Sequence, residues 1–217
     1  MARKFAGIIA CVGWFALTLQ FYLILTVPEN QSLTVAERII RYFSFFTILT
    51  NLIVALTTSA IAFLSESRLG NFAARPSTQT AVAGYIAIVG IVYSLFLRAV
   101  WDPVGLQAVA DHLLHDAVPL AYVIYWIAFA PKAGISWTSP FIWLVYPLAY
   151  VAYSLARGAA SGWYPYWFVD VTQLGYATAL TNTAFVLLAF LITGFVFAGL
   201  AKLFARRAVD ATAPVAD

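Results

Sequence analysis

The chain has 217 residues, of which 63% are apolar and only 10% are charged, and its formal net charge is +3. This composition excludes an ordinary soluble domain and is typical of an integral membrane protein. The small positive charge therefore predicts contact with anionic lipid, and we expect no nucleic-acid partner.

Six apolar segments are long enough to cross a bilayer, which takes about 20 helical residues. In chain order they lie at about Phe5–Val27, Ile40–Leu64, Thr80–Trp101, Ala110–Ala130, Ser139–Ala156 and Thr181–Phe204. The first segment is too long for a signal peptide and lacks a small-residue cleavage site, so we expect it to be retained. The sequence predicts an all-α bundle of six transmembrane helices over residues 1–208, followed by a disordered cytoplasmic tail over residues 209–217.

The basic residues divide unequally between the two sides of these spans. If both termini are cytoplasmic, the inner side holds Arg3, Lys4, Arg68, Arg75, Lys132, Lys202, Arg206 and Arg207. The outer side then holds only Arg38, Arg41, Arg98 and Arg157. The positive-inside rule thus predicts cytoplasmic termini in a multi-pass protein of the cell membrane. The outer side also receives most of the carboxylates, namely Glu29, Glu37, Asp102, Asp111, Asp116 and Asp170.

The fourth span opens with Asp111-His112-Leu-Leu-His115-Asp116, which contains both histidines of the chain. Ionisable groups at membrane depth are costly, so they usually pair with one another and line a functional site. Together with the outer arginines, this stretch predicts a paired polar cavity in the outer half of the membrane.

Helical spacing gives four spans a polar face that we expect to turn toward the interior of the bundle. The second span contributes Arg41, Ser44, Thr47, Asn51 and Thr58, and the third contributes Ser94 and Arg98. In the fourth span His112, His115, Asp116 and Pro119 share a face, with Asp111 one turn before His115. The fifth span contributes Tyr146, Tyr150, Tyr153 and Arg157.

Three chemistries fit these residues. In the first, Thr47 attacks an ester carbonyl, His115 takes its proton, Asp111 or Asp116 orients the imidazole, and Asn51 or a nearby arginine stabilises the oxyanion. In the second, His112 and His115 bind a catalytic zinc with Asp116 or Asp170, although no HExxH motif is present. In the third, the arginines hold a lipid carboxylate in a binding or transport site and no bond is broken.

Three stretches of the sequence resemble a known family. They are Arg41-Tyr-Phe-Ser-Phe-Phe-Thr47-Ile-Leu-Thr50-Asn51-Leu, Leu-Leu-His115-Asp-Ala-Val-Pro119, and Arg157-Gly followed by Gly162-Trp-Tyr-Pro-Tyr-Trp-Phe-Val-Asp170. They resemble the bacterial six-pass membrane proteins of the Pr-six-Pr family, from the first span to the sixth. That family is distantly similar to the androgen-induced and androgen-dependent TFPI-regulating proteins, which are threonine hydrolases of fatty acid esters of hydroxy fatty acids.

The resemblance implies a lipid-ester hydrolase without a cofactor, in which Thr47 is the nucleophile and His115 is the base. The register against the hydrolases needs a one-residue gap, so Thr50 stays an alternative nucleophile. The spacing around the histidine is not identical either, so His112 stays an alternative base. We assign substrate binding to Arg41, Arg98, Arg157, Tyr146, Tyr150, Tyr153 and Asp170. The competing interpretations are a lipid or small-acid binder or transporter and a zinc hydrolase, and the sequence leaves the oligomeric state open.

An aromatic run from Trp163 to Phe168, ending in Asp170, lies in the predicted loop from Gly158 to Leu180. Such a run is typical of an interfacial belt or of a lid that returns toward the bundle. In the lid interpretation, Asp170 pairs with Arg157 or Arg98 and holds the loop down.

Overall fold

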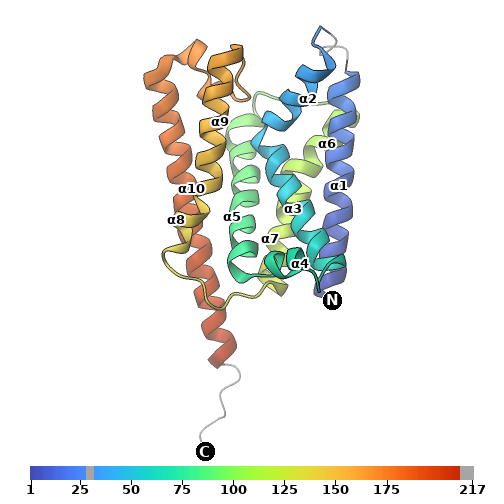
Figure 1. Cartoon of the computed structure of the whole chain (residues 1–217), viewed down its shortest axis with the longest axis vertical. Helices are drawn as coiled ribbons and strands as arrows, with labels where there is room; N and C mark the ends of the chain where they lie inside the picture. The colour runs from blue at the N-terminus through green and yellow to red at the C-terminus, as the bar shows by residue number, and fades with distance from the viewer. Residues whose placement is uncertain (28–31, 211–217) are drawn as a thin grey trace, which may run out of the picture.

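The computed structural model describes residues 1–27 and 32–210, with side chains described to residue 207. Over these residues the fold is all-helical, without strands, and six helical segments are long and apolar enough to cross a membrane (Figure 1). These segments are Ala2–Thr26, Phe46–Phe63, Pro76–Leu97, Leu106–Phe129, Ser139–Ser161 and Val171–Arg207. The prediction of an all-α multi-pass protein is confirmed. Glu29 and the tail from residue 211 onward lie outside the described residues.

The helices have the following bounds. The first half of the chain forms α1 (Ala2–Thr26), α2 (Val35–Ser44), α3 (Phe46–Phe63), α4 (Arg68–Ala73), α5 (Pro76–Val92) and the π-helical turn η2 (Tyr93–Leu97). The second half forms α6 (Leu106–His112), the π-helical turn η3 (Leu113–Ala117), α7 (Val118–Phe129), α8 (Ser139–Trp143), α9 (Val145–Ser161), the 3-10 turn η4 (Trp167–Val169) and α10 (Val171–Asp210).

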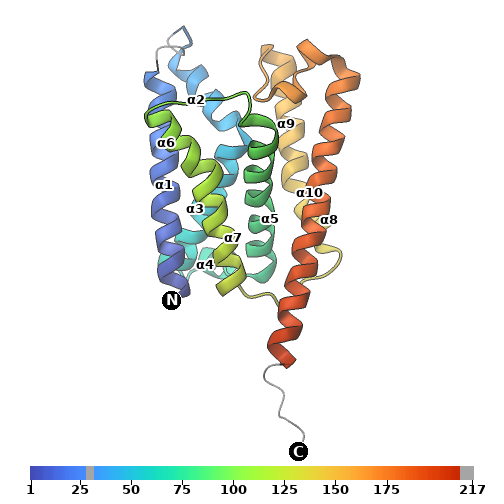
Figure 2. The same ribbon diagram turned by 180° about the vertical axis from the view of Figure 1, so that it is seen from behind.

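Helix α5 lies in the middle of the bundle and packs against α3, α7 and α10 (Figure 1, Figure 2). Helix α1 packs against α3 and α7, whereas α9 lies beside α10. Large buried side chains such as Ile86, Tyr122 and Trp126 fill the space between these helices. The N-terminus and the descending end of α10 lie at the same end of the bundle, together with α4 (Figure 1). The opposite end carries α2 and the segments that precede α6 and α10 (Figure 1).

The second predicted span is interrupted, which corrects the expectation of one helix over Ile40–Leu64. Phe45 is extended (φ −83°, ψ 128°) and separates α2 from α3. The Phe45 amide donates to the carbonyl of Tyr42 at 3.4 Å in a tighter turn, and the Ser44 hydroxyl donates back to the carbonyl of Ile40 at 2.7 Å. These bonds end α2, so Thr47 lies in the first turn of α3 and not in the middle of a long polar stripe.

The fourth span contains a π-helical turn, and it separates the two histidines that an ideal helix places on one face. Pro119 has no amide hydrogen, so the carbonyl of His115 loses its α-helical donor, and the turn over Leu113–Ala117 accommodates this loss. The side chain of His115 is 13% exposed, whereas that of His112 is 65% exposed. The predicted shared face is therefore wrong.

The connection between the last two spans is shorter than predicted, because α9 continues to Ser161 and α10 already begins at Val171. Gly162 ends α9 in the left-handed conformation (φ 68°), which glycine adopts without steric cost. The segment 162–170 is left to join the two helices. Gly175 (φ 74°, ψ 161°) interrupts α10 soon after its start.

Candidate functional site

A cavity of about 340 Å³ lies between α1, α2, α3, η2, α6, η3 and the segment 162–170. The elements that line it lie at the end of the bundle opposite the N-terminus and the descending end of α10 (Figure 1). Its wall includes Thr47, Tyr93, Gln107, Asp111, His115 and Tyr166. Elements that are far apart in the sequence therefore bring a hydroxyl, an imidazole and a carboxylate to the wall of one cavity.

The hydroxyl and the imidazole face each other. Thr47 Oγ1 lies 3.3 Å from His115 Nε2. The other ring nitrogen, Nδ1, lies 3.0 Å from the carbonyl oxygen of Asp111 and 3.2 Å from its carboxylate Oδ1. Because both of these atoms are acceptors, we assign the proton to Nδ1, which leaves Nε2 free to accept from Thr47. A hydroxyl, an imidazole and a carboxylate thus lie in a row, as in a nucleophile–base pair with an orienting acid, and such contacts are often this loose before substrate binds.

Tyr93 belongs to this site although the sequence did not indicate it. Its hydroxyl donates to Asp111 Oδ2, and its ring stacks on that of His115 with the centroids 3.9 Å apart and an angle of 12° between the planes. The Arg98 amide donates to the Tyr93 carbonyl, five residues earlier, at 2.9 Å. This π-helical turn changes which side chains of the third span face the interior. The spacing of an ideal helix had predicted Ser94 there instead of Tyr93.

Asn51 and Thr50 have structural hydrogen bonds beside the site. Asn51 Nδ2 donates to the carbonyl of Thr47 at 2.9 Å and to that of Leu114 at 3.1 Å, and so ties α3 to η3. Both hydrogens of this amide are thereby used. Thr50 Oγ1 lies 3.0 Å from the Tyr146 hydroxyl and does not line the cavity. Of the two candidate threonines, the structure places Thr47 beside His115.

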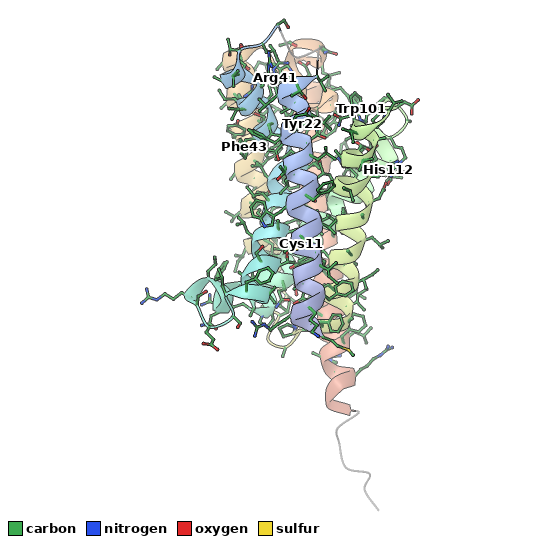
Figure 3. The ribbon with its side chains drawn as sticks, turned by 90° about the vertical axis from the view of Figure 1, so that its right-hand side faces the viewer. Cys11, Tyr22, Arg41, Phe43, Trp101 and His112 are labelled. Carbon is green, nitrogen blue, oxygen red and sulfur yellow. The ribbon has the colours of Figure 1, made fainter. Side chains whose placement is uncertain are left out.

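His112, Asp116 and Arg98 form an exterior cluster. His112 Nδ1 lies 2.8 Å from Asp116 Oδ2, and Arg98 pairs with the other oxygen of that carboxylate. Figure 3 shows His112 on the outer side of the bundle, below Trp101. The cluster does not line the cavity, but Arg98 reaches over the Tyr93 ring with its guanidinium 5.0 Å from the centroid.

Arg41 and Arg157 both contact Trp163. Their guanidinium carbons lie 4.7 and 4.6 Å from the centre of the indole, and Arg157 Nη1 donates to the Trp163 carbonyl at 3.3 Å. Burial, together with the nearby charge of Arg157, lowers the pKa of Arg41. Neither arginine lines the cavity. They hold the segment 162–170, from which Pro165 and Tyr166 reach the cavity wall.

The tyrosines of the fifth span connect α9 to α2 and α3. The Tyr150 hydroxyl donates to the carbonyl of Ser44 at 2.8 Å, and the Tyr153 hydroxyl lies 3.0 Å from Ser44 Oγ. Tyr146 contacts Thr50 as described above. The three phenols therefore meet polar residues of the second span. Tyr153 is nevertheless 42% exposed, and none of the three lines the larger cavity.

A narrow apolar slot lies on the far side of Thr47, between α3, α5, α9 and α10. Its volume is about 60 Å³, and its wall includes Val89, Val92, Leu155, Val186 and Phe190. Thr47, Tyr93 and Tyr166 border both the slot and the larger cavity. Thr47 thus stands between the larger cavity, whose mostly apolar wall carries the polar side chains named above, and an almost wholly apolar slot.

Asp170 caps α10 and pairs with neither Arg157 nor Arg98, which corrects the lid contact expected from the sequence. Its Oδ1 accepts from the Thr172 amide at 2.9 Å and from the Thr172 hydroxyl at 2.5 Å, and Oδ2 accepts from Gln173 Nε2 at 2.9 Å. These bonds, led by that from the Thr172 hydroxyl, lower the pKa of Asp170. Asp170 therefore fixes the start of the last helix.

No group of three or more His, Cys, Asp or Glu side chains lies close enough to hold a metal ion within residues 1–27 and 32–207. Comparisons with protein-family models, with curated proteins and with solved structures find no significant match. The fold and the site thus define a multi-pass helical membrane protein in which Thr47, His115 and Asp111 meet in the wall of one cavity. The resemblance to the Pr-six-Pr proteins stays a prediction.

Proposed function

We propose that the chain is an intramembrane hydrolase of lipid esters, in which Thr47 is the nucleophile and His115 is the general base. The observation that carries this proposal is the 3.3 Å contact between Thr47 Oγ1 and His115 Nε2 in the wall of a cavity. A hydroxyl in a cavity wall beside an oriented imidazole is the usual arrangement for acyl transfer.

In the proposed reaction, Thr47 Oγ1 attacks the ester carbonyl carbon while His115 Nε2 accepts the hydroxyl proton. The tetrahedral intermediate collapses, His115 returns the proton to the departing alcohol, and the acyl group stays on Thr47. A water molecule then gives a proton to His115 and attacks the acyl-threonine. His115 returns this proton to Thr47 Oγ1 as the fatty acid leaves, which restores the hydroxyl. Asp111 stabilises the imidazolium that forms in each step.

The first turn of α3 supplies the donors for the developing oxyanion in this proposal. The helix begins at Phe46, so its first amides have no carbonyl acceptor one turn back. The Thr47 amide has only a long contact of 3.4 Å with the Tyr166 hydroxyl. Free amides at a helix N-terminus favour negative charge, whereas the side-chain amide of Asn51 is already bonded to two carbonyls.

The two spaces around Thr47 suggest how an ester would lie. The apolar slot suits an acyl chain, and the larger cavity, with Gln107 in its wall, suits the alcohol part. Fatty acid esters of hydroxy fatty acids, which the resemblance implies, fit this division. With cytoplasmic termini, as the distribution of lysine and arginine indicates, the cavity opens toward the outer leaflet of the cell membrane.

Covalent labelling of the purified protein with a fluorophosphonate probe tests the proposal. We expect the wild type and Thr47→Ser to be labelled, and Thr47→Ala and His115→Ala to lose labelling while still folding. Thr50→Ala is the matched control, because Thr50 is bonded to Tyr146 and should leave labelling intact. A folded wild type that resists labelling would contradict the hydrolase and favour a lipid or small-acid binder or transporter. Ester hydrolysis that a chelator abolishes would favour the zinc alternative.

A further inference from the structure

Tyr93 contacts the orienting carboxylate and the imidazole of the site at once. It is buried, with 3% of its surface exposed, and it comes from η2, whereas Asp111 and His115 come from α6 and η3. Its hydroxyl donates to Asp111 Oδ2 and its ring stacks on the imidazole. One side chain of the third span thereby contacts both Asp111 and His115, which lie on the fourth span.

The hydrogen bond from the Tyr93 hydroxyl stabilises the carboxylate of Asp111. This residue is 4% exposed, and a buried carboxylate is stable as an anion only when donors surround it. His115 Nδ1 lies 3.2 Å from one oxygen, and Tyr93 donates to the other. With both oxygens engaged, the carboxylate cannot turn away from the imidazole.

The ring contact limits rotation of the imidazole. A stacked aromatic pair keeps the two planes parallel, so His115 cannot rotate its Nε2 away from Thr47 without losing the contact. Arg98 in turn lies over the Tyr93 ring and is paired with Asp116. Tyr93 therefore has its own support from the exterior cluster.

The geometry points to Tyr93 as a positioning residue, which holds Asp111 and His115 in the arrangement that activates Thr47. This inference rests on the proposed function, because it assigns Tyr93 a role in the same acyl transfer. Tyr93 does not exchange a proton with the substrate. It fixes the tautomer and the direction of His115 through the carboxylate and through the ring.

The rate of fluorophosphonate labelling separates the two contacts of Tyr93. Tyr93→Phe keeps the stacked ring but removes a hydrogen bond to a charged group, so we expect labelling to slow roughly ten- to a hundredfold. Tyr93→Leu removes both contacts and should be slower still. Tyr85→Phe is the matched control, because Tyr85 lies on the same span, in α5, and donates its hydroxyl to the carbonyl of Trp143, away from the cavity. It should be labelled at the wild-type rate.

The chain has only two histidines, so ¹⁵N-histidine labelling followed by NMR reads the imidazole directly and does not depend on turnover. A His112→Gln variant assigns the signals. We expect His115 in the wild type to carry its proton on Nδ1, with that proton shifted downfield by Asp111, and we expect Tyr93→Phe to shift this signal and mix the tautomers. Tyr85→Phe should leave the spectrum unchanged.

The two readouts distinguish failure of this inference from failure of the proposed function. Wild-type labelling rates and an unchanged His115 signal in folded Tyr93→Phe would overturn the positioning role even if Thr47 is labelled. If the wild type is not labelled, the hydrolase fails, and the spectrum of Tyr93→Phe still decides whether Tyr93 sets the tautomer of His115.

Discussion

His115 has Asp111, one helical turn earlier, as its carboxylate partner, and not the adjacent Asp116. The Nδ1–Oδ1 distance to Asp111 is 3.2 Å, whereas Asp116 is bonded to His112 and Arg98 on the outside of the bundle. The sequence left either carboxylate open as the orienting group. The two carboxylates are five residues apart and face different sides of the span, so Asp111 lines the cavity and Asp116 does not.

The different positions of Asp111 and Asp116 predict a large effect for one Asp→Asn substitution and a small effect for the other. Asp111→Asn should slow fluorophosphonate labelling and ester turnover by about a thousandfold or more, because an amide can no longer fix the imidazole tautomer. Asp116→Asn should change both rates by no more than a few-fold. Equal losses in the two variants would contradict the assignment of Asp111.

The apolar slot predicts a chain-length preference that one substitution can alter. Val186 lies in its wall on α10, and Val186→Trp should fill much of a space of only about 60 Å³. We expect turnover of long-chain p-nitrophenyl esters to fall at least tenfold relative to the acetate ester, since each excluded methylene forfeits about 0.8 kcal/mol of burial. Leu180→Trp, at an exposed position on α10 outside both cavities, is the control. An unchanged chain-length profile in Val186→Trp would exclude the slot as the acyl site.

Gly158 predicts a strong effect of adding one methyl group. The Tyr164 ring lies directly on Gly158, so a Cβ at this position would overlap the ring. Gly158→Ala should lower the free energy of unfolding by about 1–3 kcal/mol, because the displaced ring must move the segment 162–170. Thermal unfolding in detergent measures this change.

Gly84→Ala is the control for that substitution, because its added Cβ would have Thr193 Cγ2 at 4.0 Å as its nearest contact. Alanine also favours the helix by up to about 1 kcal/mol over glycine, so stability should be unchanged or slightly higher. A Gly158→Ala protein as stable as Gly84→Ala would show that Tyr164 moves at no cost.

Asp170 predicts a loss of stability in acid. Its hydrogen bonds from Thr172 and Gln173 lower its pKa in the folded state, so the folded protein binds this proton more weakly than the unfolded chain. The resulting stabilisation is fully present above the unfolded pKa of about 3.9 and is lost as the pH falls through the lower folded value. Asp170→Asn keeps an N-cap that does not titrate. The difference in unfolding temperature between wild type and Asp170→Asn should therefore shift against the wild type between pH 7 and pH 3. A difference that is independent of pH would contradict the role of this carboxylate.

The sequence predicted the number and order of the spans well, because about 20 consecutive apolar residues have few alternatives to a transmembrane helix. It also predicted Thr47, Asp111 and His115 as candidates, since polar groups within apolar spans are expensive and therefore conspicuous. The break at Phe45 was not predicted, because neither proline nor glycine marks it. Tyr93 was missed for a related reason, since a π-helical turn has no sequence signature as clear as that of a regular helix.

The sequence by itself thus determined the class of the protein and the candidate groups, because hydropathy and the cost of burying charge are properties of the residues. Only the tertiary structure decided which groups meet. The directions of the side chains depend on the helix order, on the break before α3 and on the two π-helical turns. One extra residue in a helical turn moves every later side chain to another face of the helix. These directions bring Thr47, Tyr93, Asp111 and His115 to one cavity and leave His112 and Asp116 outside it.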